Sequence, residues 1–135
     1  MARLIDTGVF IEWERDGRPP DRLPIPCGEP FALASISASE LLAGVLGAQP
    51  GVRRSRREPY VGALLLEIAV LPFDLDAARV HARLVAAMKL AGRTVGGNDL
   101  LIAATALAHG YAVVTRNRRD FDRVPGLTVE DPDWP

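Results

Sequence analysis

Four acidic residues, each set in a short polar or apolar motif, are the side chains of this sequence best suited to chemistry. They are Asp6 in Leu-Ile-Asp-Thr-Gly, Glu40 in Ser-Ala-Ser-Glu-Leu-Leu, Asp99 in Gly-Asn-Asp-Leu-Leu-Ile-Ala-Ala, and Asp120 in Thr-Arg-Asn-Arg-Arg-Asp-Phe. Carboxylates that share a pocket repel each other unless a cation neutralises them. An all-oxygen acidic pocket suits Mg²⁺ or Mn²⁺. Because such an ion can activate water and shield a phosphodiester, the four acids predict metal-dependent phosphodiester hydrolysis.

The elements that carry these acids are short apolar runs separated by helical sequence. Five runs predict strands, at residues 3–5, 31–34, 68–71, 111–115 and 127–129. Helices are indicated over 75–91 by apolar residues at three- and four-residue intervals, and over 100–109 by a nearly continuous apolar stretch that Gly110 ends. Alternation of this kind is typical of an α/β fold with buried parallel strands.

The positions of the acids in these elements predict that they converge. Ligands of an open parallel sheet lie beyond the carboxyl ends of its strands. Asp6 ends the first predicted strand and Asp120 follows the fourth, and we expect these two strands to be neighbours. Glu40 and Asp99 are expected in the first turns of helices that begin at, or reach, the same edge.

Each motif also has a purely structural interpretation. Ser37-x-x-Glu40 matches a capping box, in which Glu40 only closes a helix N-terminus. Asn98 and Asp99 suit an ordinary helix start, and the polar residues after the fourth strand suit a simple turn. Asp6 is the hardest to explain in this way, because an acid inside an apolar run is costly to bury without a partner.

Length and composition predict one domain over residues 1–135 in a reducing, cytoplasmic setting. The chain has 135 residues and a formal net charge of -1. Cys27 is its single cysteine, so no intramolecular disulfide can form. The N-terminus lacks the basic and apolar pattern of a secretory signal. The most apolar segment, 61–73, contains Glu67 and is too short to cross a bilayer.

Taken together, the motifs resemble those of the PIN-domain family, and within it the VapC-type toxins of bacterial toxin–antitoxin pairs. Asp6-Thr7 is similar to the family's opening motif, Glu40 to its Glu-Leu-Leu, Asp99 to its Asn-Asp-x-x-Ile-Ala-Ala, and residues 115–121 to its closing motif. The resemblance covers nearly the whole chain. It implies a three-layer α/β/α fold and a magnesium-dependent endoribonuclease that is usually dimeric and is silenced by a cognate antitoxin.

The resemblance also implies roles for polar neighbours of the acids. Thr7, Thr115 and Asn117 would support the carboxylates or a metal-bound water. Among the basic residues, the arginines beside the motifs are the candidates for holding the scissile strand of RNA, namely Arg93, Arg116 and Arg118. The arginines at 53, 54, 56 and 57 are interpreted as a solvated helix face.

One position departs from the family pattern, which usually has serine where this chain has Gly8. The resulting Asp6-Thr7-Gly8 triplet also occurs in aspartic proteases, but those look like all-β proteins, whereas this sequence is rich in helical periods. A haloacid-dehalogenase-like phosphatase would need a second Asp at position 8. A response-regulator receiver would need a late Lys after a strand, and the single Lys89 lies in a predicted helix. A non-catalytic PIN-like module that binds RNA or protein remains the alternative.

A protein partner is expected on the helical surface of the N-terminal half. Trp13 follows Phe10 and Ile11 on a short predicted helix, where an exposed aromatic residue would anchor an interface. The competing interpretation places Trp13 in the core.

Overall fold

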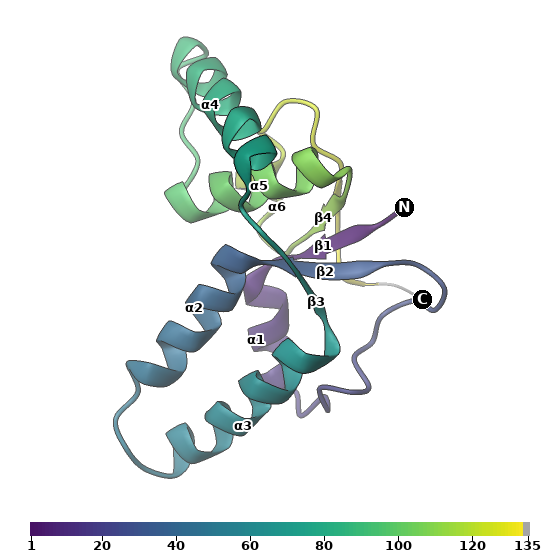
Figure 1. Ribbon diagram of the computed structural model, residues 1–135, viewed down its shortest axis with the longest axis vertical. Coiled ribbons are helices and arrows are strands. Elements are labelled where there is room, and N and C mark those ends of the chain that lie inside the picture. Colours follow the sequence, from purple (N-terminus) through teal and green to yellow (C-terminus); the bar gives the residue numbers. More distant parts are fainter. Residues whose placement is uncertain (134–135) are drawn as a thin grey trace.

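The computed structural model describes residues 1–133 and contains one five-stranded sheet (Figure 1). All strand pairs are parallel, in the order β3-β2-β1-β4-β5. The elements are β1 (Arg3–Ile5), α1 (Thr7–Arg15), β2 (Phe31–Ala34), α2 (Ser35–Leu46), α3 (Val52–Glu67), β3 (Ala69–Leu71), α4 (Leu75–Leu90), α5 (Gly97–His109), β4 (Ala112–Val114), α6 (Arg118–Phe121) and β5 (Val129–Glu130). Residues 134 and 135 of the predicted domain lie outside the described residues.

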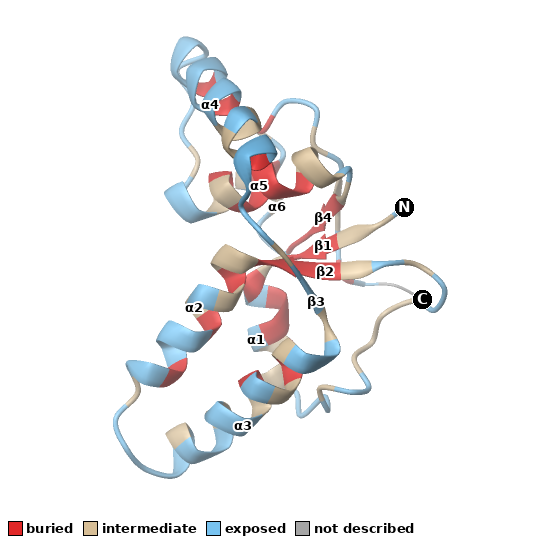
Figure 2. Ribbon diagram, viewed as in Figure 1, coloured by how far each residue is buried: buried red, intermediate tan, exposed pale blue. Residues whose placement is uncertain are grey.

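Helices cover both faces of the sheet, which confirms the predicted three-layer α/β/α fold. α1, α2 and α3 lie below the sheet in Figure 1, and α4, α5 and α6 lie above it. Successive strand residues point to opposite faces. Leu4 therefore packs into the core of the upper layer, and Ile5 into the core of the lower layer. The central strands are buried on both faces (Figure 2), which explains their continuous apolar runs.

The sequence located the elements well, with differences at their ends. The helix predicted over 100–109 begins earlier, at Gly97, and ends as expected at Gly110, which adopts a left-handed conformation with φ 73°. The strand predicted over 127–129 is observed at Val129–Glu130. The reason is that Leu127 still belongs to a turn, with its N–H bonded to the carbonyl oxygen of Val124 at 3.4 Å.

The capping box predicted at Ser37 and Glu40 is wrong. α2 begins at Ser35 and its N-cap is Ala34, so Ser37 lies inside the helix and Glu40 lies in its second turn rather than its first. Ser37 is fully buried, and its hydroxyl has no hydrogen-bond partner among the described residues. Glu40 therefore does not cap α2, and its carboxylate can interact with other residues.

Trp13 packs in the core, so the interface anchor expected from it is wrong. Its exposed fraction is 5%, and its ring meets that of Phe10 edge to face at a centroid distance of 5.7 Å. Ile11, on the opposite side of α1, is 42% exposed. Within residues 1–133, no helix has the length and apolar character needed to cross a membrane.

The corrected position of Ser37 predicts a simple stability result. Ser37→Ala should leave the free energy of unfolding unchanged or raise it, because the substitution removes a buried hydroxyl that has no partner. Loss of a true capping residue would instead cost about 1 kcal/mol. Urea unfolding of the two proteins distinguishes these outcomes, and a loss of that size would restore the capping interpretation.

Candidate active site

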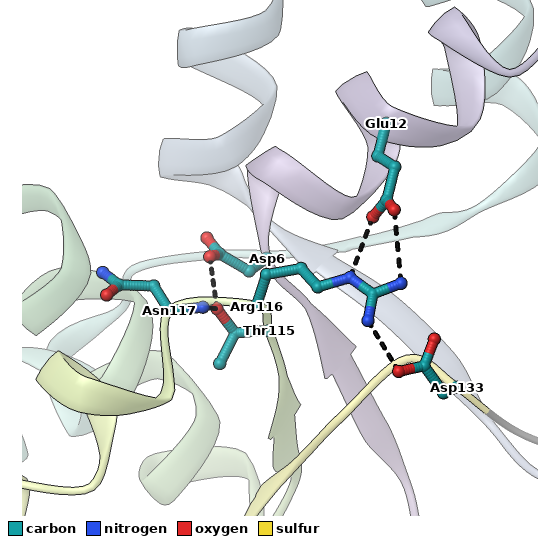
Figure 3. A network of polar contacts seen from close by, with 6 residues as sticks. All are labelled: Asp6, Glu12, Thr115, Arg116, Asn117 and Asp133. Carbon is teal, nitrogen blue, oxygen red and sulfur yellow. Dashed lines mark hydrogen bonds and ion pairs between the residues drawn. The ribbon is translucent and has the colours of Figure 1, made fainter.

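The candidate site lies where the strand order reverses, between β1 and β4. Asp6 directly follows β1 and Thr115 directly follows β4, so the two residues face each other across the sheet edge. The Thr115 hydroxyl donates a hydrogen bond of 2.8 Å to the Asp6 carboxylate (Figure 3). Asp6 is also the N-cap of α1, yet its side chain makes no capping bond within the described chain. Thr115 is therefore the side chain that holds this carboxylate at the sheet edge.

Glu40 joins this edge through Thr7. The Thr7 hydroxyl, at the start of α1, donates a 2.8 Å hydrogen bond to Glu40 Oε1 on α2. Thr7 is buried, with an exposed fraction of 7%, and Glu40 is half-buried. A fixed hydroxyl in the first turn of one helix thereby orients an acid of the next.

Asp99 and Asp120 are bridged by Asn117. The Asn117 side-chain amide donates to Asp99 Oδ2 at 3.1 Å and to Asp120 Oδ2 at 3.0 Å. Its backbone N–H donates to the Thr115 hydroxyl oxygen at 2.9 Å, which ties this pair to Asp6. Asp99 lies in the first turn of α5, as expected, but the N-cap there is Gly96.

Burial and like charge act on these carboxyls. Burial, followed by the charges of its three acidic neighbours, raises the pKa of Asp99 to about 6, and the Asn117 amide opposes that rise. The contributing acids are Asp6, Asp120 and Glu40. Burial also raises the pKa of Asp6, and the Thr115 hydroxyl opposes it. Asp99 therefore lies near enough to the other three acids for their charges to act on its carboxyl group.

The donor set fits a hard divalent cation. All four acids and their polar neighbours offer oxygen, the ligand type that Mg²⁺ and Mn²⁺ prefer. Within residues 1–133, no group of three or more acidic, histidine or cysteine side chains is arranged so that it could hold a metal ion directly. Mg²⁺ is typically held through one or two carboxylates together with waters, so a Mg²⁺ site here would use one or two of the acids directly and reach the others through water.

The three arginines proposed to hold RNA have different surroundings. Arg93 is exposed in the segment between α4 and α5, beside a cavity of about 490 Å³. Arg118 lies 3.5 Å from carboxylate oxygens of both Asp122 and Asp131. Arg116 forms ion pairs with Glu12 at 3.1 Å and with Asp133 at 2.7 Å. RNA binding by these residues stays a prediction.

Sequence reasoning missed the acids that partner Arg116. Glu12 lies on α1 and Asp133 follows β5, so neither is near residue 116 along the chain. No motif spacing signals such a contact. At the position where the family pattern has serine, a Cβ added to Gly8 would meet no atom within 4 Å, so the site itself does not demand glycine.

The raised pKa of Asp99 predicts how stability depends on pH without metal. The folded protein binds the Asp99 proton up to about pH 6, whereas the unfolded chain releases it near 3.8. Stability from this group is thus present below the unfolded pKa and lost as pH rises through the folded pKa. In chelator, we expect Asp99→Asn to be more stable than the parent at about pH 7.5, with the advantage shrinking towards about pH 4.

Urea unfolding across this pH range measures the effect. The control is Asp76→Asn, which makes the same change at an exposed first-turn aspartate of α4. A parent protein that is more stable than Asp99→Asn at neutral pH would contradict the clustered-charge description.

Known proteins share both the sequence pattern and the fold. The PIN domain model matches residues 3–127. A VapC ribonuclease of Sinorhizobium fredii is 37% identical, with 96% of each chain covered. A tRNA(fMet)-specific endonuclease VapC of Salmonella typhimurium is 33% identical over 75% of this chain and 74% of that protein. The crystal structure of VapBC-5 from Mycobacterium tuberculosis superposes with a TM-score of 0.73 at 34% identity, covering 96% of both chains.

These similarities extend over almost the whole sequence and over the fold. PIN-domain ribonucleases generally use a divalent metal ion, in agreement with the oxygen-rich donor set. The segment of this chain that the family model matches, residues 3–127, includes all four carboxylates and their hydroxyl and amide partners. The chain belongs to the PIN-domain family, among the VapC-type ribonucleases.

Proposed function

We propose that this protein is a Mg²⁺- or Mn²⁺-dependent endoribonuclease and the toxin of a VapBC-type toxin–antitoxin pair. The observation that carries the proposal is the grouping of four carboxylates near the β1–β4 switch point. There, the charges of Asp6, Asp120 and Glu40 help to raise the pKa of Asp99. Such a concentration of negative charge is unfavourable alone and becomes favourable beside a divalent cation, which can also shield the negative charge of a phosphodiester.

Each side chain has a proposed part in the reaction. Asp6, Glu40, Asp99 and Asp120 would hold the ion, directly or through its waters. When bound, the ion supplies a water of lowered pKa and positive charge beside the phosphate. Thr115 holds Asp6, and Thr7 holds Glu40, each through its hydroxyl. Asn117 keeps Asp99 and Asp120 a fixed distance apart.

The substrate is proposed to be structured RNA, with tRNA as the first to test. The Salmonella relative carries a tRNA in its name, and this chain shares most of that protein's length. Structured RNA is recognised mainly by shape, phosphates and exposed loops. Arg93 is exposed and makes no ion pair within residues 1–133, so it is the most available of the proposed phosphate contacts.

The proposed partners are a cognate antitoxin and a second copy of the chain in the cytoplasm. The Mycobacterium structure contains a VapBC complex. Apolar side chains of this chain are exposed on α2, α3 and α4, and surface of this kind marks contact sites for proteins. Leu46 is 67% exposed, Leu66 90% and Leu90 91%.

Metal binding should depend on pH in the range where Asp99 titrates. We expect Mn²⁺ to raise the melting temperature of the parent at about pH 7.5, because the ion binds the folded state preferentially. The rise should fall away below about pH 6, where protons compete for Asp99. Thermal melts with saturating Mn²⁺, with chelator as the reference, measure this. A shift that is independent of pH between 5 and 8 would place the ion away from Asp99.

Cleavage itself distinguishes the enzyme from a non-catalytic binding module. We expect the parent to cut tRNA with Mg²⁺ or Mn²⁺ and not with chelator. Asp99→Asn should fold at least as well and lose about 100-fold or more in rate, the scale of removing one charge-stabilising group from an active site. Asp76→Asn should retain full activity. Binding of RNA without divalent-dependent cleavage, or full cleavage by Asp99→Asn, would favour the binding module or remove Asp99 from the site.

A further inference from the structure

All three guanidinium nitrogens of Arg116 donate to two acids from distant parts of the chain. Its Nε and Nη2 atoms donate to the two carboxylate oxygens of Glu12 on α1, at 3.1 and 3.2 Å. Its Nη1 atom donates to Asp133 at 2.7 Å. Figure 3 shows the side chain running from the strand end towards these acids and away from Asp6. The hydrogen bonds that Arg116 donates to Asp133 and Glu12 raise the pKa of its guanidinium above the usual value.

The backbone of Arg116 lies between two side chains of the candidate site. Thr115 before it is fully buried, holds Asp6, and is fixed by a backbone bond to Glu130 at 3.0 Å. Asn117 after it bridges Asp99 and Asp120. Asn117 is exposed, and its N–H is bonded to the Thr115 hydroxyl. Residue 116 therefore connects the end of the sheet to Asn117, which contacts Asp99 and Asp120.

We propose that Arg116 is a positioning residue that locks this segment to α1 and the C-terminal segment, so that Asn117 sets the separation of Asp99 and Asp120. The proposal rests on the proposed nuclease function. In this proposal Glu12 and Asp133 act with Arg116 by accepting its hydrogen bonds. It differs from the expectation that Arg116 holds the RNA. A two-pronged contact with a carboxylate fixes an arginine in direction as well as position.

Two features of the surroundings favour positioning over RNA contact. Each guanidinium nitrogen of Arg116 already donates to Glu12 or Asp133, so a phosphate would compete with these acids for the side chain. Neighbouring residues help to fix the position of Asp133, because Pro132 beside it is buried and Arg118 contacts Asp131. Arg116 is 49% exposed, and exposed ion pairs add little to stability. The contact should therefore matter for geometry more than for folding.

The test uses Arg116→Gln, Glu12→Gln and the double variant. Positioning predicts that both single variants slow single-turnover cleavage at saturating RNA by about 3- to 10-fold, because small displacements of reacting groups are costly. The double variant should be no slower than the slower single variant, since Arg116→Gln already removes the one contact that Glu12→Gln removes. RNA affinity in chelator, and its dependence on salt, should stay within about twofold of the parent.

A second measurement does not need catalysis. The Mn²⁺-induced rise in melting temperature should be smaller in Arg116→Gln and in Glu12→Gln, while the metal-free melting temperature stays close to that of the parent. The matched control is the Arg57–Glu14 pair, which likewise ties an arginine to α1 but carries no site residue. Arg57→Gln and Glu14→Gln should leave cleavage rate and Mn²⁺ shift unchanged.

The effect of Glu12→Gln on RNA affinity distinguishes the positioning role of Arg116 from a phosphate-binding role. If Arg116 binds phosphate, Arg116→Gln weakens RNA binding and reduces the salt slope by about 1, whereas Glu12→Gln frees the arginine and tightens binding. That pattern would overturn the proposal, as would parental cleavage and Mn²⁺ shifts in both variants. A parent that shows no cleavage but a Mn²⁺ shift would count against the nuclease function alone, because the shifts of the variants still test the positioning.

Discussion

Repulsion among four carboxylates at one edge of a parallel sheet is the constraint on which the site of this protein depends. Burial, together with the charges of Asp6, Asp120 and Glu40, raises the pKa of Asp99 to about 6. Two hydroxyls and one amide hold the acids in place without cancelling their charge. The chain thus keeps a charge imbalance that a divalent cation can relieve, as in the family to which it belongs.

The rigid part of the molecule explains how such a site is tolerated. β1 and β4 are buried on both faces, and the residues that follow them inherit fixed positions from the sheet. Segments beyond the sheet need other support. Thr7 joins α1 to α2, and the pairing of Arg116 with Glu12 joins the motif after β4 to α1. Polar contacts between elements, rather than further burial, therefore complete the arrangement.

Much of this could be predicted from the sequence, and the exceptions have physical reasons. Buried parallel strands appear as apolar runs, so the sequence predicts β1, β2 and β4 directly, and with them the position of Asp6 at the end of β1. The capping box at Ser37 was wrong because local spacing does not reveal where a helix begins once the preceding strand leads straight into it. Trp13 was ambiguous because an aromatic residue on a short helix suits a core and an interface equally. The pairing of Arg116 with Asp133 joins segments that meet only in the folded chain.

The most direct test of the shared cation site is a crystal structure of the protein grown with Mn²⁺, with anomalous diffraction used to locate the ion. A site built by the four carboxylates predicts anomalous density in the space they face, within coordinating or water-bridged reach of Asp6, Asp99 and Asp120. Asp99→Asn crystals should show weaker density at the same place. Strong density elsewhere on the protein, with none beside these carboxylates at saturating Mn²⁺, would contradict the assignment of a metal-dependent centre.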